Sequence, residues 1–267
     1  MNKKIGFIGA GKMAQAIIEG IVTSNMIPKE NIMASAATEK TINKIVQAYG
    51  IFTTLHNKDV ARFADILILA VKPDLYASVI EEIKKDIKQN AIIVTIAAGI
   101  SLLDIEQEFG FQIKAVRTMP NTPSLVGEGM SAICSNDYLS EDEIAEVECL
   151  FSCFGKTERL QEKFMDAVPS ISGSSPAYVY MLIEAMADGG VRQGIPRDKA
   201  YRLAAQAVLG AAKMVLETGL HPGELKDDVC TPGGATIEAI VTLEQKQFRG
   251  SIMAAMENCT KKVKSLK

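Results

Sequence analysis

The sequence contains no tryptophan, only two histidines and only five cysteines, and no two of the cysteines form a CxxC pair. With so few nitrogen and sulfur ligands, we expect no zinc site and no other bound metal. Cys149 and Cys153 stand four residues apart on one face of an expected helix. Buried or idle thiols are the favoured interpretation, and a redox or metal role is the alternative. The scarcity of histidine also argues against a Ser-His-Asp hydrolase, so a bound cofactor is expected to carry the chemistry.

A strong charge of one sign and long apolar runs are missing as well. The net charge is −3, and the lysines are scattered except for a C-terminal group that is typical of a solvated helix end, so no nucleic-acid partner is expected. No apolar run reaches the roughly 18–20 residues that cross a bilayer, so no membrane partner is expected. The N-terminal residues show no secretory signal pattern. We therefore expect a cytoplasmic protein.

The first half alternates short β-branched runs with amphipathic stretches, the pattern of βαβ units around a parallel sheet. The strands are expected at Lys4–Ile8, Asn31–Ala34, Ile66–Val71, Ile92–Ala97 and Lys114–Thr118. The helices between them are expected at Gly11–Ser24, Glu39–Tyr49 and Leu75–Ile87. Ile66–Val71 is apolar throughout, which suits a strand that is buried on both faces.

The pattern changes near Lys163, after which no strand is expected. Long helical stretches rich in small residues follow, at Ser175–Gln193, Arg197–Thr218, Ile237–Gln245 and Gly250–Ser265. Such helices can pack closely on several sides, which favours a helical domain that also buries surface against another subunit. A self-contained helical bundle is the alternative.

The loop Gly9–Ala14 follows an expected strand and opens an expected helix, which is the setting that a dinucleotide-binding GxGxxA motif requires. Gly9 would allow the tight turn, Gly11 would let a pyrophosphate approach the backbone, and Ala14 would allow close packing of helix on sheet. The fold class that follows is α/β, with a Rossmann-type doubly wound sheet in residues 1–162 and an all-α domain in residues 163–267.

An NAD-binding chain usually carries an acidic residue at the end of its second strand, bonded to the ribose 2′-hydroxyl. Here that strand ends in small and hydroxyl residues that include Ser35 and Ala36, and the first carboxylate is Glu39. This leaves room for a 2′-phosphate, although no arginine stands there to bind it. NADPH is favoured and NADH stays possible.

Three further motifs fall at the carboxyl ends of expected parallel strands, where open α/β sheets bind ligands. They are Ala70–Pro73, Ala97–Gly99 and Met119–Pro123. Proline and glycine can also simply end a strand, but three such motifs on one edge favour contacts to a cofactor. Lys72 is either a catalytic group or a strand-end residue beside the cofactor.

A second small-residue loop, Thr231–Thr236, starts a helix in the second half of the chain. Pro232 suits a first helical turn, and Thr231 can cap it. Gly233 and Gly234 would let a small carboxylate reach unpaired N–H groups at the positive end of the helix dipole. The alternative is an ordinary capped helix.

Taken together, these segments resemble the pyrroline-5-carboxylate reductase family. The resemblance runs in order from Lys4 to the C-terminus and is carried by Gly6–Gly11, His56–Lys58, Ala70–Pro73, Asn121–Pro123, Ser172–Tyr178, Ala187–Val191, His221–Asp227 and Cys230–Ile237. It implies a Rossmann domain, an all-α domain that forms an interlocked homodimer, and in some members a decamer of five dimers. It also implies that NADPH or NADH reduces a cyclic imine carboxylate, 1-pyrroline-5-carboxylate, to L-proline.

The motifs and the resemblance together give a set of expected site residues. The cofactor is expected to contact Ile8, Gly9, Ala10, Gly11, Lys12, Met13, Ser35, Ala36, Asn57, Ala70, Val71, Lys72, Pro73, Ala97, Ala98, Gly99 and Asn121. The substrate is expected to contact Thr231, Gly233, Gly234, Ala235 and Thr236. The resemblance makes Thr236 the catalytic residue, hydrogen-bonded to the ring nitrogen.

The sequence departs from the family pattern at two positions. Thr231 replaces a serine that many relatives carry, and it keeps the hydroxyl. Ala36 stands where many relatives have a serine that reaches the 2′-phosphate, which weakens the preference for NADPH.

Three other interpretations stay open from the sequence. A β-hydroxyacid dehydrogenase shares the order of domains but relies on a lysine in the first long helix of the second domain, and no lysine occurs between Gly173 and Gly194. A sensor that binds a dinucleotide without catalysis is the second rival. The third is reduction of a six-membered cyclic imine.

Overall fold

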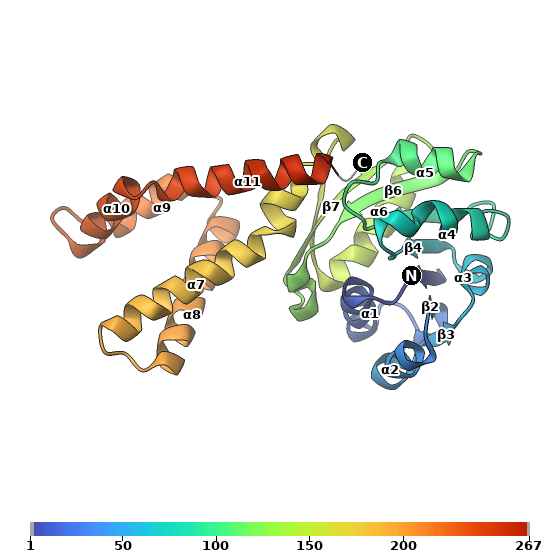
Figure 1. Ribbon diagram of the computed structural model, residues 1–267, viewed down its shortest axis with the longest axis horizontal. Coiled ribbons are helices and arrows are strands. Elements are labelled where there is room, and N and C mark those ends of the chain that lie inside the picture. Colours follow the sequence, from blue (N-terminus) through green and yellow to red (C-terminus); the bar gives the residue numbers. More distant parts are fainter. Residues whose placement is uncertain (1–2, 266–267) are drawn as a thin grey trace. The chain divides into compact units, whose positions relative to one another are not determined.

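The computed structural model describes residues 3–265, which form two compact units (Figure 1). One unit runs to Ser174 and also takes in the segment from Cys259 onward, and the other is Ser175–Asn258. The C-terminal helix therefore begins in the second unit and ends in the first.

The first unit is built on an eight-stranded sheet with the order β3-β2-β1-β4-β5-β6-β7-β8. Its strands are β1 (Ile5–Ile8), β2 (Ile32–Ser35), β3 (Phe52–Thr54), β4 (Ile66–Leu69), β5 (Ile92–Thr95), β6 (Lys114–Met119), β7 (Gly129–Ser135) and β8 (Gly155–Arg159). Strands β1 to β6 are all parallel, in the order that defines the Rossmann fold. The expected doubly wound sheet is confirmed, and each of the five expected strands is present with ends shifted by two residues or fewer.

The sheet is larger than the sequence indicates, because β3, β7 and β8 were not expected. β7 runs antiparallel to β6, and β8 is parallel to β7. The added pair extends the parallel sheet at the edge beyond β6.

Helices cover both faces of this sheet, because alternate strand residues point to opposite sides. Ile66 and Ile68 of β4 pack with α1 (Lys12–Ser24), α2 (Glu39–Tyr49) and α6 (Glu141–Phe151) in one apolar core. Leu67 and Leu69 pack on the other face with α3 (Asn57–Phe63), α4 (Tyr76–Ile83) and α5 (Leu102–Phe109). The expectation that this strand is buried on both faces is therefore correct.

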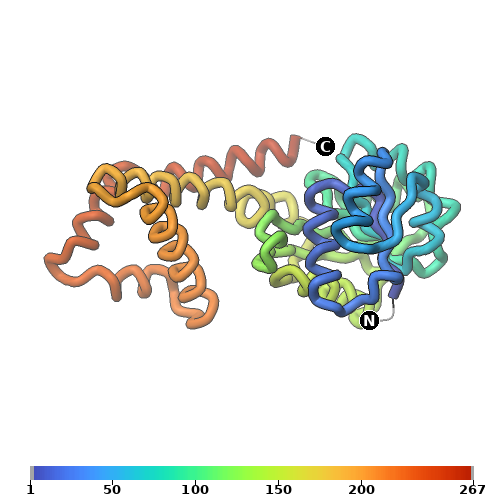
Figure 2. The backbone as a smooth tube through the Cα atoms, turned by 90° about the horizontal axis from the view of Figure 1, so that it is seen from below, coloured from blue at the N-terminus to red at the C-terminus, as the bar shows by residue number. Residues whose placement is uncertain are grey.

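The second unit consists of helices, as expected. They are α7 (Ser175–Arg192), α8 (Arg197–Thr218), α9 (Pro222–Val229), α10 (Ala235–Gln245) and the first part of α11 (Phe248–Lys264). α7 and α8 pack against each other, and Figure 2 shows the chain turning back between them. The short helix α9 was not expected, because its eight residues include only two large apolar side chains, Leu225 and Val229.

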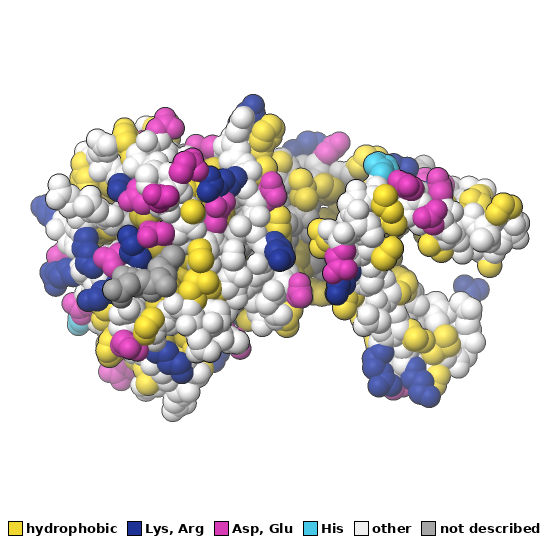
Figure 3. Space-filling model, turned by 180° about the vertical axis from the view of Figure 1, so that it is seen from behind, with side chains coloured by type: hydrophobic (Ala, Val, Ile, Leu, Met, Phe, Trp, Pro, Cys, Tyr) yellow, Lys and Arg dark blue, Asp and Glu magenta, His cyan; other side chains and the backbone are white. Residues whose placement is uncertain are grey.

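The helical unit has almost no core of its own. Across Ser175–Asn258, all of which the structure describes, the only buried residues are Ala187, Ala200 and Ala204. Large apolar side chains lie exposed instead, among them Met181 at 69 % and Leu203 at 61 % (Figure 3). A self-contained bundle would bury such side chains, so that alternative is wrong for this chain and the unit needs a partner surface.

Membrane insertion by a helix finds no support in the structure: across residues 3–265 no helix combines the length and the apolar character that a bilayer crossing requires.

Candidate functional site

The expected dinucleotide loop lies at the point where the strand order reverses, between β1 and β4. The N–H of Ala70 donates to the carbonyl of Ile8 at 2.8 Å, so the loops that follow β1 and β4 lie against each other. Gly9 has φ +94°, and a Cβ there would be 2.6 Å from the carbonyl oxygen of Ala70. Only glycine fits both the backbone angle and the space.

Gly11, in contrast, has free space around it: a Cβ there would touch nothing within 4 Å. It is the N-cap of α1, no side chain caps that helix end, and the first turn carries no acidic residue. The first N–H groups of α1 therefore face open space at the positive end of the helix dipole. This geometry fits a dinucleotide pyrophosphate, and Ala14 is buried beneath it as expected.

Three polar side chains form a chain of hydrogen bonds beside the end of β2. The hydroxyl of Ser35 donates to Asn57 Oδ1 at 2.8 Å, and Asn57 Nδ2 donates to Glu82 Oε2 at 2.8 Å. The Rossmann fold binds the adenosine ribose at the end of the second strand. Glu82 thus supplies, from α4, the carboxylate that the sequence lacks at that strand end.

A buried network fixes the loops after β4 and β5. The Tyr76 hydroxyl donates to the carbonyl of Leu69 at 2.8 Å and lies 2.7 Å from Thr95 Oγ1. Thr95 Oγ1 also accepts the N–H of Ala97 at 3.2 Å. Burial raises the pKa of Tyr76 well above its usual range, so the phenol stays protonated and acts as a donor.

The same two loops border a cavity of about 280 Å³. Pro73 and Gly99, both expected at the cofactor, line it together with the ring of Tyr76. Gly99 adopts φ +83°, which allows the chain to turn sharply after β5.

Asn121 and Lys72 take different positions at the same edge. Asn121 is buried, donates from Nδ2 to the carbonyl of Ser172 and accepts the N–H of Met130, each at 2.9 Å. Its amide braces the chain through these two bonds, and a contact of this residue to a cofactor stays a prediction. Lys72 is exposed at the N-terminus of the 3-10 turn Pro73–Leu75, and a catalytic role for it stays untested.

The expected substrate loop has a different local structure from the one predicted. Thr231–Gly234 forms a turn closed by the N–H of Gly234 on the carbonyl of Thr231 at 3.0 Å, and Gly233 adopts φ +68°. The helix α10 begins only at Ala235, with Gly234 as its N-cap. Pro232 therefore lies in the turn and Thr231 does not cap the helix, which corrects the expectation. Proline suits the second position of a turn as well as the first helical turn.

The turn still presents a helix end to solvent. No side chain caps α10, and Thr231 and Ala235 are exposed. Thr236 is half-buried in the first turn. A Cβ on Gly234 would lie 2.4 Å from Thr231 Oγ1, so a larger residue there would force the Thr231 side chain to move.

All of the expected cofactor residues lie in the first unit, and all of the expected substrate residues lie in the second. The structure gathers the cofactor set at the carboxyl edge of β1, β2, β4, β5 and β6. Sequence reasoning missed Tyr76, Thr95 and Glu82, which support that edge. No local motif marks them, because each acts through a contact to another element.

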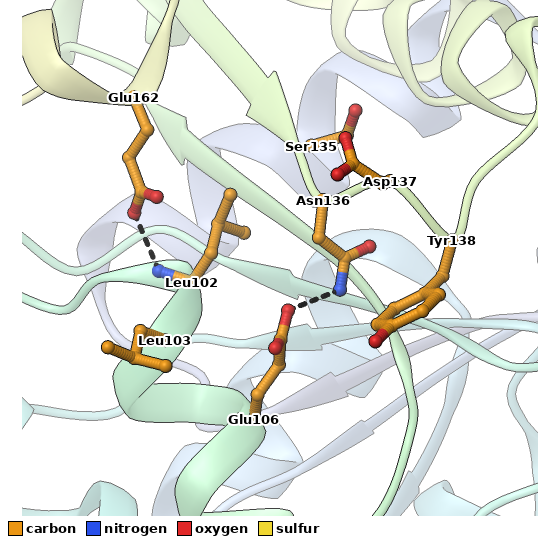
Figure 4. A pocket seen from close by; sticks show the side chains of 8 residues that line it. All are labelled: Leu102, Leu103, Glu106, Ser135, Asn136, Asp137, Tyr138 and Glu162. Atoms are coloured by element: carbon orange, nitrogen blue, oxygen red, sulfur yellow. Dashed lines mark hydrogen bonds between the residues drawn. The ribbon is translucent and has the colours of Figure 1, made fainter.

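A second cavity beside the sheet is not part of this site. It measures about 370 Å³ and lies between α5 and the segment that follows β7 (Figure 4). Glu106 accepts from Asn136 Nδ2 at 2.7 Å, and Glu162 accepts from the N–H of Leu102 at 2.7 Å. None of the expected site residues lines this cavity, whose hydrogen bonds join α5 to its neighbours.

Two of the thiols, Cys134 and Cys153, show no sign of an activated nucleophile. Burial raises the pKa of Cys134 to about 12, with the nearby Glu162 carboxylate adding to the effect. Burial also raises the pKa of Cys153. Both thiols stay protonated near neutral pH, when the thiolate is the reactive form.

Comparison with protein families divides the chain in a similar way. Residues 162–266 match the model for pyrroline-5-carboxylate reductase dimerisation. Residues 4–99 match the model for NADP oxidoreductase, coenzyme F420-dependent.

Individual proteins resemble the chain over its whole length. Pyrroline-5-carboxylate reductase of Escherichia coli is 44 % identical over 266 residues, which cover 100 % of this chain and 99 % of that protein. The enzyme of the same name from Arabidopsis thaliana is 42 % identical, with 98 % and 95 % covered. The crystal structure of Plasmodium falciparum pyrroline carboxylate reductase, which has NADP bound, superimposes with a TM-score of 0.89 at 34 % identity, with 99 % and 98 % covered.

Proposed function

The chain belongs to the pyrroline-5-carboxylate reductase family, and from this premise we propose that it reduces the C=N bond of 1-pyrroline-5-carboxylate to give L-proline, using NADPH or NADH. The observation that carries the proposal is the match over the full chain, in which the dinucleotide loop and the Thr231–Thr236 loop both occur in their expected order.

The first unit would bind and orient the dinucleotide. The uncapped N-terminus of α1 and the open space above Gly11 fit the pyrophosphate. The loops Ala70–Pro73 and Ala97–Gly99, held by Tyr76 and Thr95, would border the rest of the cofactor. When bound, the reduced nicotinamide supplies the hydride that the imine carbon accepts.

The second unit would hold the substrate carboxylate at the start of α10. The N–H of Gly234 is used within its own turn, so the N–H groups that remain for an anion begin at Ala235. Gly233 and Gly234 would keep the turn narrow enough for the ring to approach these donors. Fixing the carboxylate decides which face of the ring meets the cofactor.

Thr236 would act on the ring nitrogen. Its hydroxyl lies one residue inside the helix end, and we assign it the hydrogen bond to that nitrogen. Reduction of an imine adds one proton to nitrogen, which arrives beforehand as an iminium or is delivered through Thr236 or water. Positioning would then provide most of the rate enhancement, for which oriented reactants gain about 7–11 kcal/mol. Little acid–base machinery is needed, in accord with a chain that has two histidines.

In this proposal residues 1–162 would bind the dinucleotide, and residues 163–267 would bind the substrate and form the subunit contact. The family match to a dimerisation region and the exposed apolar helices support homo-oligomerisation. A decamer of five dimers is a further part of the proposal, tested by the mass of the particle in light scattering. A cytoplasmic location is also proposed, since all five thiols are unpaired, as in a reducing compartment, and cell fractionation tests it.

The deciding experiment is a steady-state assay of the purified protein. 1-Pyrroline-5-carboxylate is offered with NADPH and then with NADH, and both the loss of reduced nicotinamide and the formation of proline are followed. We expect turnover with stoichiometric proline, and the ratio of the two kcat/KM values gives the cofactor preference.

Two control substrates make the result specific. A six-membered cyclic imine carboxylate tests ring size, and a β-hydroxyacid with the oxidised cofactor tests the dehydrogenase alternative. Tight binding of the dinucleotide without turnover of any imine would overturn the proposal and leave a binding role.

A further inference from the structure

Three sulfur atoms from distant parts of the first unit meet at one point. Cys149 Sγ and Cys153 Sγ each lie 3.6 Å from Sδ of Met26. Met26 is more than 120 residues away along the chain, and its N–H is held by the Ser24 hydroxyl at 3.3 Å. The sequence indicates only the two thiols, and the fold adds the thioether.

The spacing of the sulfurs suits a shared metal ion. With a metal–sulfur bond of about 2.3 Å, two sulfurs 3.6 Å apart subtend an angle of about 100° at one ion. That angle is compatible with trigonal or tetrahedral coordination. The thiol of Cys149 is exposed and that of Cys153 half-buried, so an ion can enter from solvent.

The surroundings favour a cation as well. α1 ends at Ser24, two residues before Met26, and Cys149 lies in the last turn of α6, which ends at Phe151. The C-terminal ends of both helices, with their partial negative charge, therefore converge on the sulfurs.

We propose that Met26, Cys149 and Cys153 form a binding site for a soft monovalent ion, copper(I). Thiolate and thioether sulfur together select copper(I), whereas zinc prefers four ligands from thiolate, imidazole and carboxylate. Among residues 3–265 no group of three His, Cys, Asp or Glu side chains is placed to hold a metal, so the proposed site depends on the Met26 thioether as its third ligand. Binding releases two thiol protons and leaves one copper(I) ion bonded to two thiolates and one thioether, with no change of oxidation state.

The test uses the reduced full-length protein under anaerobic conditions. Copper(I) is delivered from a chromogenic chelator, so that transfer of the ion to the protein is read as loss of the chelate colour. We expect the protein to take one copper(I) ion per chain from an equimolar amount of the chelator. The X-ray absorption spectrum of the complex should then show three sulfur neighbours of copper and no nitrogen or oxygen neighbour.

The variants Cys149→Ser, Cys153→Ser and Met26→Leu are compared with Cys259→Ser and Met186→Leu, which change one sulfur residue each outside the cluster. Loss of one ligand should weaken binding at least as much as loss of a supporting contact does, about 10–100-fold, whereas the two control variants keep the affinity of the unchanged protein. Circular dichroism and thermal unfolding of each metal-free variant report that it has folded.

Two results would overturn the proposal. One is equal loss of copper(I) in the cluster and control variants, which means unspecific thiol binding. The other is an unchanged sulfur count in Met26→Leu, which removes the thioether from the site. Failure of the proposed reductase function would leave the copper measurements unaffected.

Discussion

Gly9 is needed for the fold and Gly11 for the approach of the cofactor, and alanine substitutions at the two positions should therefore have different effects. In Gly9→Ala the methyl group would meet the carbonyl of Ala70 at 2.6 Å in a left-handed backbone conformation, so we expect a loss of about 1–3 kcal/mol in the free energy of unfolding. In Gly11→Ala the fold has room and the stability should be unchanged, but the methyl group stands where the pyrophosphate approaches. We expect KM for the dinucleotide to rise about 10–100-fold. Thermal unfolding and initial rates measure the two effects, and normal cofactor binding by Gly11→Ala would move the pyrophosphate elsewhere.

Thr236 offers a direct test of the proposed chemistry. Thr236→Ala removes the hydroxyl assigned to the ring nitrogen, and kcat should fall about 10–10³-fold, the range for one lost transition-state hydrogen bond or general acid. Thr236→Ser keeps the hydroxyl and should recover most of the rate. Unchanged turnover in Thr236→Ala would exclude this side chain from the mechanism.

Glu82 is the residue at which cofactor preference can be changed. Its carboxylate accepts from Asn57 beside the end of β2, where a 2′-phosphate would meet like charge. Glu82→Gln keeps an acceptor for Asn57 and removes the charge, so the ratio of kcat/KM for NADPH to that for NADH should rise about 2–10-fold, less at high salt. The neighbouring Glu81→Gln, which pairs with Lys84, is the control and should leave the ratio unchanged.

At the scale of elements, Tyr76 connects the end of β4 to the end of β5. Tyr76→Phe leaves the carbonyl of Leu69 and the hydroxyl of Thr95 without that partner, which should cost about 1–3 kcal/mol of stability. KM for the dinucleotide should also rise, because Thr95 holds the N–H of Ala97 at the start of a cofactor loop. The comparison is Tyr138→Phe, an exposed tyrosine on which both quantities should stay at their original values.

The elements that the sequence predicts are those with a strong local pattern. Ile66–Leu69 is a continuous apolar run between turn residues, and Glu39–Tyr49 has its cap Thr38 and its terminal Gly50 in the sequence. Strand β7 begins at a glycine and contains the buried polar Ser131, so only its partners reveal it as a strand. The antiparallel direction of β7 depends on the path of the loop before it, which no periodicity encodes.

The candidate site divides in the same way. Glycines 9, 99 and 233 are visible in the sequence because each gives a short motif a left-handed backbone conformation. Gly11 is visible because it belongs to the same motif as Gly9, where its missing side chain leaves open space. Contacts between elements are not visible: Tyr76 with Thr95, Asn57 with Glu82, and Met26 with Cys149 join residues 19, 25 and 123 positions apart. The start of α10 also could not be decided, because Pro232 suits both a turn and a first helical turn.

At the scale of the whole molecule, the helical unit must be completed by a second copy of the chain. Within this unit only three alanines are buried, so its large apolar side chains stay exposed in a single chain. The family match assigns residues 162–266 to dimerisation. Leu203 of α8 is 61 % exposed in the single chain, and Leu103 of α5, outside the matched region, is 59 % exposed. The two leucines form a matched pair for one substitution.

Leu203→Glu would place a charge among apolar helices that must lose water on association, which is costly unless the charge is paired. We expect the particle mass in light scattering to fall towards that of one chain. The melting temperature should fall as well and lose the dependence on protein concentration that an oligomer shows when dissociation accompanies unfolding. Leu103→Glu should leave the mass and the concentration dependence as in the original protein. An unchanged oligomer in Leu203→Glu would place the subunit contact on another face of the helical unit, because a buried leucine at the interface does not tolerate a carboxylate.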